Sequence, residues 1–212
     1  GPVAVNLGLH IPPAGGVPSM SLQVALRDSD AVYAEQYLPT RAPAFNPALV
    51  DWLTAADFQG QVPLAIFQFE GSLLREATRD ERQLDLYLQV EQGSLNFQPG
   101  WPRLEQVRSV VRLNNTDLTI QPAEARLLNT QLSKVVVTTG RASAAEPLML
   151  TVAGHAEGPL ADALTVMQDT PLAQTSGDPL AGWQGSGQLA GDLYLAFPLN
   201  SEQSPQIRVN WQ

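Results

Sequence analysis

The sequence predicts an all-β protein of antiparallel strands, interrupted by two short helices. Three observations carry this prediction. Apolar residues alternate with polar or small residues along most of the chain. Turn-forming residues break this alternation roughly every 8–12 residues, which gives about a dozen strands. Only two stretches show apolar residues at helical spacing.

The first strands are predicted near the N-terminus. Residues 3–9 place valine and leucine at every second position, as a half-buried strand requires. The proline- and glycine-rich segment 11–16 ends this strand. A second strand is expected over 22–26, and the acidic segment 27–30 reads as the turn that follows it.

The same alternation continues through the rest of the chain. It is cleanest over 84–90, where leucine and valine alternate with polar residues. Further predicted strands cover 61–74, 95–97, 107–113, 118–120, 123–127, 132–139, 148–156, 189–197 and 207–211. Such short, regularly spaced strands are typical of antiparallel sheets.

Two helices are predicted by capping residues and spacing. Asn46 is a good N-cap for a helix over 47–56, whose apolar residues recur at helical spacing. A second helix is expected to begin near Pro159 and to stop before Pro171.

Composition excludes several classes of function. Charged residues make up 16% of the 212-residue chain and the formal net charge is −9. No cluster of lysine and arginine is present to neutralise phosphates, so nucleic-acid binding is not expected. The chain has no cysteine, which excludes disulfides, zinc ribbons and cysteine nucleophiles.

Residues suited to catalysis or metal binding are sparse. His10 and His155 are the only histidines, and each is expected to be an ordinary surface residue. Several acidic pairs occur in turns, and a carbohydrate-active fold with two facing carboxylates is kept only as a weak third alternative. We therefore predict no enzyme activity, no metal and no cofactor.

Apolar alternation by itself leaves two interpretations open. One is a closed structural β-sandwich that mediates assembly with neighbouring domains, in which a second sheet covers the apolar face. The other is a groove in which a lipid covers that face. The strands are rich in leucine and poor in charge, which favours the groove without deciding the matter.

One segment adds a family resemblance. Residues 93–104 read Gly-Ser-Leu-Asn-Phe-Gln-Pro-Gly-Trp-Pro-Arg-Leu, which resembles the phrase F-Q-P-x-W-P-x-L of YhdP members of the AsmA-like superfamily. Residues 37–60 and the ending around 193–199 are similar to further family patterns. The likeness runs from about residue 20 to residue 212.

The resemblance implies a fold and a function. Such proteins look like inner-membrane-anchored bridges in the periplasm of Gram-negative bacteria. Their antiparallel sheets are curved and open, forming a taco-like groove that is thought to pass phospholipid between inner and outer membranes. The implied partners are phospholipid, neighbouring β-groove segments of the same chain, and proteins of either membrane.

The chain is expected to be one internal part of that groove. Gly1-Pro2 reads as a remnant of protease cleavage, and residues 3–212 as a single β-groove segment with a possible sub-boundary near 76–82. The membrane anchor and the ends that meet each membrane would lie elsewhere.

Groove-lining residues are predicted from the alternation. The face of 134–138 is ambiguous, because a shift of one residue inverts a strand. Helix 47–56 is expected to cap, plug or flank the groove, and Trp52 and Trp101 to be core anchors. The predicted lining consists of Leu95, Phe97, Val111, Leu113, Leu118, Ile120, Leu127, Val135, Val137, Leu150, Val152, Leu193, Leu195 and Phe197.

Overall fold

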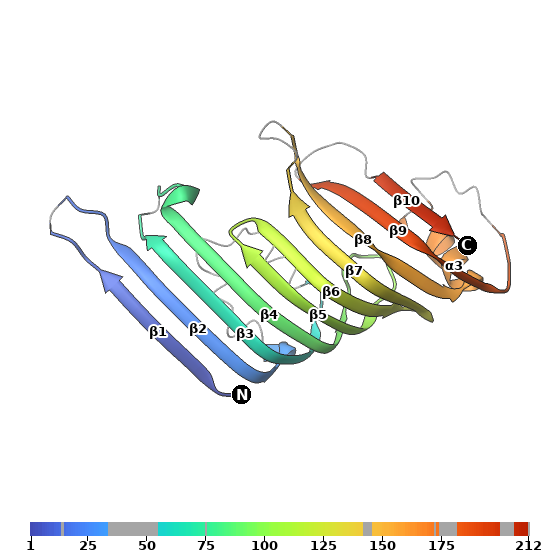
Figure 1. Cartoon of the computed structure of the whole chain (residues 1–212), viewed down its shortest axis with the longest axis horizontal. Helices are drawn as coiled ribbons and strands as arrows, with labels where there is room; N and C mark the ends of the chain where they lie inside the picture. The colour runs from blue at the N-terminus through green and yellow to red at the C-terminus, as the bar shows by residue number, and fades with distance from the viewer. Residues whose placement is uncertain are drawn as a thin grey trace.

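Ten antiparallel strands form one open sheet in the computed structural model (Figure 1). The structure describes residues 1–13, 15–33, 55–74, 76–141, 146–171, 173, 182–199 and 206–211. Its strands are β1 Val3–His10, β2 Ser19–Asp30, β3 Gln59–Ser72, β4 Arg82–Leu95, β5 Leu104–Asn114, β6 Asp117–Leu127, β7 Thr130–Gly140, β8 Leu148–Pro159, β9 Gln188–Leu199 and β10 Gln206–Trp211. Its helices are α3 Leu160–Asp169 and the 3-10 turns η1 Ala31–Tyr33 and η2 Arg79–Glu81.

The sheet is a simple meander. The strands lie in the sheet in the order in which they occur in the chain, so each inner strand pairs with its two sequence neighbours. β1 and β10 are the two edge strands. The sheet passes from β3 to β4 without interruption. The predicted open antiparallel architecture is confirmed, with ten strands in the described part of the chain where about a dozen were expected.

Three local predictions are wrong, and the first is the separate strand expected over 95–97, because Leu95 is the last residue of β4. Residues 27–30 do not end a strand, because β2 continues to Asp30 and pairs with β3 through that segment. Asp28 takes a left-handed backbone conformation (φ 48°) within the strand, which explains how a turn-like sequence fits there. Residues 118–120 and 123–127 are one strand, β6, with an irregular register between them.

The helix predictions have different outcomes. The helix expected between Pro159 and Pro171 is present as α3. The helix expected over 47–56 falls almost entirely outside the described residues, as does Trp52.

The two faces of the sheet differ in composition. Residues that pair directly across two strands point to the same side, so the register assigns every strand residue to a face. We call the apolar face the side that carries Leu22, Phe67, Leu86 and Val111, and the polar face the side that carries their neighbours in sequence. The apolar face therefore continues from one edge of the sheet to the other.

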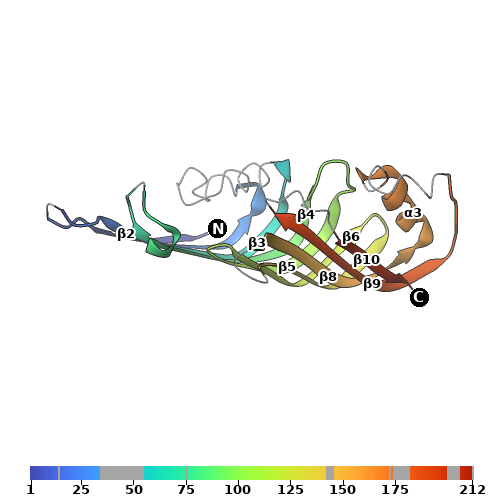
Figure 2. The same cartoon turned by 90° about the horizontal axis from the view of Figure 1, so that it is seen from above.

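The sheet is flat at one end and curved over most of its width. Figure 2 shows β1 and β2 as a flat ribbon, whereas the strands from β4 onward bend into a trough. Register shifts occur in each ladder from β3–β4 to β7–β8. Gln92, Gln106 and Lys134 lie at these shifts with φ of 50°, 52° and 52°. Such bulges bend and twist a strand, and their succession across adjacent strands accounts for the trough.

Burial is shallow, as a single layer requires. No side chain among the described residues is completely buried, and the most buried strand residues on the apolar face, Val90 and Ala156, each retain 3% exposure. The main cluster, Phe67, Phe69 and Leu84, packs with residues of the same face. Within the described ranges no second sheet covers this face, so the closed β-sandwich interpretation is wrong.

Candidate functional site: an apolar groove

An unbroken row of apolar residues crosses the whole sheet. Each strand contributes one residue, and each is paired in register with the next. The row, which we call the apolar row, consists of Val3, Leu26, Ala65, Leu88, Val111, Ile120, Val137, Val152, Leu195 and Ile207. With a strand spacing of about 4.8 Å, nine steps give a strip roughly 40 Å long.

The apolar row lies on the concave side of the trough. Thr130 pairs with Leu127 on the apolar face and donates its hydroxyl to Asp162 of α3 at 2.9 Å. The helix therefore sits on that side of the sheet, and Figure 2 shows α3 within the hollow. Most of the buried apolar strand residues, such as Val90 and Phe67, also belong to this face. The concave surface is thus mainly hydrocarbon, and most polar strand residues lie on the convex surface.

The predicted lining residues are brought together on this surface with one exception. All of them are half-buried, and all except Phe97 lie on the apolar face by register. Val135 and Val137, whose face was ambiguous, both lie there because they pair with Ala123 and Ile120 of β6. Whether these side chains contact a lipid stays a prediction.

Phe97 lies apart from the row. β4 ends at Leu95, so Phe97 belongs to the loop between β4 and β5, where its ring packs 5.4 Å from that of Trp101. These two rings, with Ala55 and Pro99, line a half-open hollow of about 310 Å³. Trp101 is half-buried in this loop, and its role as a core anchor stays a prediction.

Several apolar residues of the same surface were not among the predicted lining. The alternation over 3–9 and 84–90 indicated these strands, but local patterns do not show which apolar residues of separate strands share one face. By register the additional members include Val5, Leu7, Leu9, Met20, Leu22, Val24, Phe67, Phe69, Leu84, Leu86, Val90, Val209 and Trp211.

The polar face carries several cross-strand polar pairs. Arg112 lies over the Tyr87 ring at 5.4 Å, and His155 Nδ1 lies 2.8 Å from an Asp192 carboxylate oxygen. His155 is thus a paired residue on the convex surface, as an ordinary surface histidine would be. Such exposed pairs contribute little stability each but keep this face hydrated.

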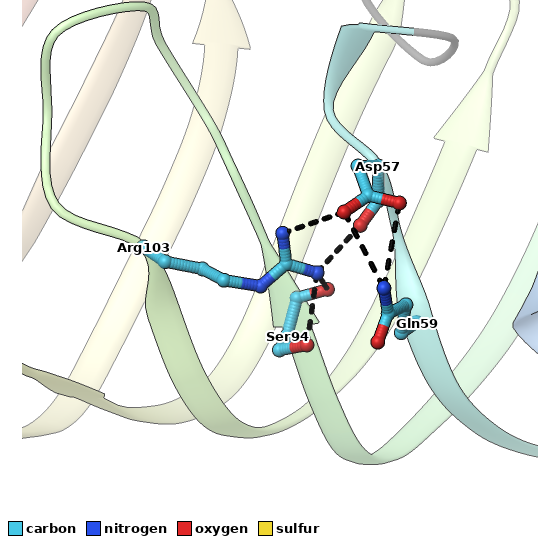
Figure 3. Close-up of polar contacts among 4 residues, drawn as sticks. All are labelled: Asp57, Gln59, Ser94 and Arg103. Atoms are coloured by element: carbon cyan, nitrogen blue, oxygen red, sulfur yellow. Dashed lines mark hydrogen bonds and ion pairs between the residues drawn. The ribbon is translucent and has the colours of Figure 1, made fainter.

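One rim of the trough is held by Arg103 (Figure 3). Its guanidinium donates to the Asp57 carboxylate at 2.9 Å, to the Asp57 carbonyl at 2.7 Å and to Ser94 Oγ at 3.1 Å. Gln59 Nε2 donates to the same carboxylate at 3.3 Å. These contacts fasten the start of β3 to the end of β4 and to the β4–β5 loop.

The described residues include no group of three or more His, Cys, Asp or Glu side chains arranged to hold a metal ion. His10 lies on β1, exposed. In the parts of the chain that the structure covers, no helix has the length and hydrophobicity needed to cross a membrane.

Comparison with known proteins gives one match. No curated protein and no solved structure is similar enough to match the chain. A family model described as YhdP protein matches residues 4–211, which includes the 93–104 segment and all ten strands except Val3 of β1. This protein belongs to the YhdP family.

Proposed function

We propose that this chain is a segment of a lipid conduit that shields phospholipid acyl chains on its concave apolar face. Membership of the YhdP family indicates a lipid-transport-related role in the cell envelope rather than catalysis. The apolar row is the observation that carries the proposal. Every strand contributes an apolar side chain to this row, and no charged residue interrupts it.

The surface suits a ligand that must slide. Burial of apolar area is worth about 25 cal/mol per Å², so an acyl chain gains affinity from contact area without any specific hydrogen bond. Backbone N–H and C=O groups within the sheet are hydrogen-bonded from strand to strand, so they need no hydrogen-bond partner from the acyl chains. Because successive residues of the row are similar in size and chemistry, a tail meets no single site that would hold it.

The proposed setting follows the family. The segment is the periplasmic part of an inner-membrane-anchored protein and carries phospholipid between the inner and outer membranes, with proteins of either membrane as partners. Neighbouring β-groove segments of the same chain are the proposed partners of the sheet edges. Val5 on β1 and Trp211 on β10 remain 63% and 43% exposed at those edges, which supports continuation of the apolar surface beyond them.

Adjacent valines on β5 provide a matched test. Val111 lies on the apolar face and Val110 on the polar face, and both are half-buried. The chain would be purified without detergent and analysed by native mass spectrometry with lipid extraction. We expect bound phospholipid in the unmodified chain and in Val110→Asp, and its loss in Val111→Asp, because a carboxylate in contact with acyl chains is unfavourable.

A second site extends the test. Leu195→Asp places the charge near the other edge and is expected to give the same loss while the fold is retained, since Leu195 is only half-buried. Equal phospholipid content in Val110→Asp and Val111→Asp, or none in the unmodified chain, would contradict the proposed function.

A further inference from the structure

Helix α3 extends along one rim of the trough. It follows β8 directly, and its ten residues span about 15 Å. Three strand spacings amount to about 14 Å, so a helix that starts at β8 can reach the level of β5. Figure 2 shows α3 on the concave side of the sheet, beside the tall loop between β4 and β5.

Asp162 fixes the first turn of α3 to the sheet. Its carboxylate accepts hydrogen bonds from the Asn129 backbone N–H at 2.7 Å, the Thr130 hydroxyl at 2.9 Å and the Asn129 side-chain amide at 3.2 Å. Asp162 is 7% exposed. The N-terminus of α3 has no side-chain capping hydrogen bond, so the Asp162 carboxylate does not cap its own helix. This carboxylate therefore serves the β6–β7 turn instead of its own helix.

A second contact fixes the other end of the helix. Pro171, just past the end of α3, packs against Gly100 in the β4–β5 loop. A Cβ built on Gly100 would lie 3.3 Å from Pro171 Cγ and Cδ, and Gly100 has a φ of 79°. The helix is thus attached at both ends to turns that belong to other strands.

Small residues of the apolar face lie near this rim. Ala125 of β6 and Ala156 of β8 pair with the same residue, Leu132 of β7. They are 7% and 3% exposed, although they belong to a single-layer sheet. A helix packed over the concave side would add to the shielding that neighbouring side chains already give these alanines.

From these contacts we infer that α3 is a latched cover over the β6–β8 section of the apolar face, and that a lipid tail enters this section only when the cover lifts. Asp162 is the latch, and the Gly100–Pro171 contact is the second fastening. The inference rests on the proposed function, because it assigns control of access to the same groove. It divides the groove into an open section at β1 and β2 and a covered section at β6–β8.

Cysteine alkylation tests the cover without any lipid. The chain has no cysteine, so Ala125→Cys provides a single reactive thiol, and Ala156→Cys is the second probe where the first does not fold. We expect slow reaction with a maleimide, and a rate about tenfold higher when Asp162→Ala removes the latch. Asp169→Ala, which removes an exposed acid from the same helix, is the matched control and should leave the rate unchanged. An equal rate with and without the latch, at both probe positions, would overturn the inference.

A staple tests the consequence for lipid. Pro99→Cys and Pro171→Cys together, joined by a short bis-maleimide, hold the cover down. The probe is pyrene-labelled phosphatidylethanolamine in vesicles of phosphatidylethanolamine and phosphatidylglycerol. We expect the stapled protein to take up the probe several-fold more slowly than the same variant capped with a monofunctional maleimide. Equal uptake rates would overturn the inference. Absence of uptake in every form would instead contradict the proposed function, while the alkylation rates still decide whether α3 is a cover.

Discussion

The flat and curved parts of the sheet share one sequence pattern but differ in how their strands pair. The β1–β2 and β2–β3 ladders keep a constant register, whereas each ladder from β3–β4 to β7–β8 contains shifts. Val5 in the flat part is 63% exposed, and Val90 in the curved part is 3% exposed. Alternation thus makes an apolar face, but the bulges turn that face into a concave one whose residues shield one another.

The largest expected difference between the two parts is in lipid retention. We expect Val137→Asp in the curved part to lower the amount of bound phospholipid by about tenfold or more, because the charge enters a surface that surrounds the tail. Leu7→Asp in the flat part should lower it by less than about twofold, since Leu7 is already 56% exposed. Lipid extracted from the purified variants and quantified by mass spectrometry gives the measurement.

The neighbouring valine supplies the control for that comparison. Val136 lies on the polar face of the same strand and is half-buried like Val137. Val136→Asp should retain phospholipid. A loss as large as that of Val137→Asp would mean that the substitution acts through folding and not through the groove.

The next expected difference is in the free energy of unfolding. Phe69 is 8% exposed in the central cluster, so Phe69→Ala should lower stability by about 3 kcal/mol. Leu7→Ala at the flat edge should cost less than about 1 kcal/mol, because most of its side chain already meets water. Urea unfolding would show the two costs as shifts in midpoint, and equal shifts would mean that the central cluster shields Phe69 no better than the flat edge shields Leu7.

Part of this arrangement could be predicted from the sequence. Alternation indicated the strands and the presence of an apolar face, since strand geometry forces alternate residues to one side. The concave shape was expected only through the resemblance carried by 93–104. The positions of the bulges could not be predicted. Gln92, Gln106 and Lys134 adopt left-handed backbone conformations there, but none of them is a glycine, the residue type that usually marks such a conformation.

Long-range contacts were also beyond sequence reasoning. Asp162 reads as an ordinary acid in the first turn of a helix, and its partners Asn129 and Thr130 lie more than thirty residues earlier in the chain. Phe97 appeared to continue the alternation of β4, but the strand ends before it and the proline that follows belongs to a loop. Register and loop placement depend on the assembled sheet, which local patterns do not specify.

A smaller effect is expected from glycine substitutions. The change in the free energy of unfolding should have opposite signs at a bulge of the curved part and in a regular strand of the flat part. Gln106 holds a left-handed conformation (φ 52°) that disfavours side chains with a Cβ, so Gln106→Gly should raise the free energy of unfolding by about 0.5–1 kcal/mol. Gln23 lies in the regular β2 strand, so Gln23→Gly should lower it by about 1 kcal/mol. Both residues are exposed, so side-chain burial does not confuse the comparison. A loss of stability in both variants would show that the bulge conformation is not strained.

The smallest expected effect lies at η2, the turn between the flat part and the curved part. The Thr78 backbone N–H and hydroxyl donate to the Glu81 carboxylate at 2.7 and 2.9 Å, and these hydrogen bonds lower the pKa of Glu81 below its ordinary value of 4.5. Because the pKa is lowered in the folded state, the stabilisation is present above pH 4.5 and is lost as the pH falls through the folded-state pKa. Thr78→Val removes the hydroxyl but keeps the backbone donor, so the pKa of Glu81 should rise only part of the way in an NMR titration. Thr119→Val, on the polar face of β6, should leave it unchanged. An identical Glu81 titration in Thr78→Val and the unmodified chain would show that the hydroxyl does not hold this turn, and that the two parts of the sheet meet through backbone pairing alone.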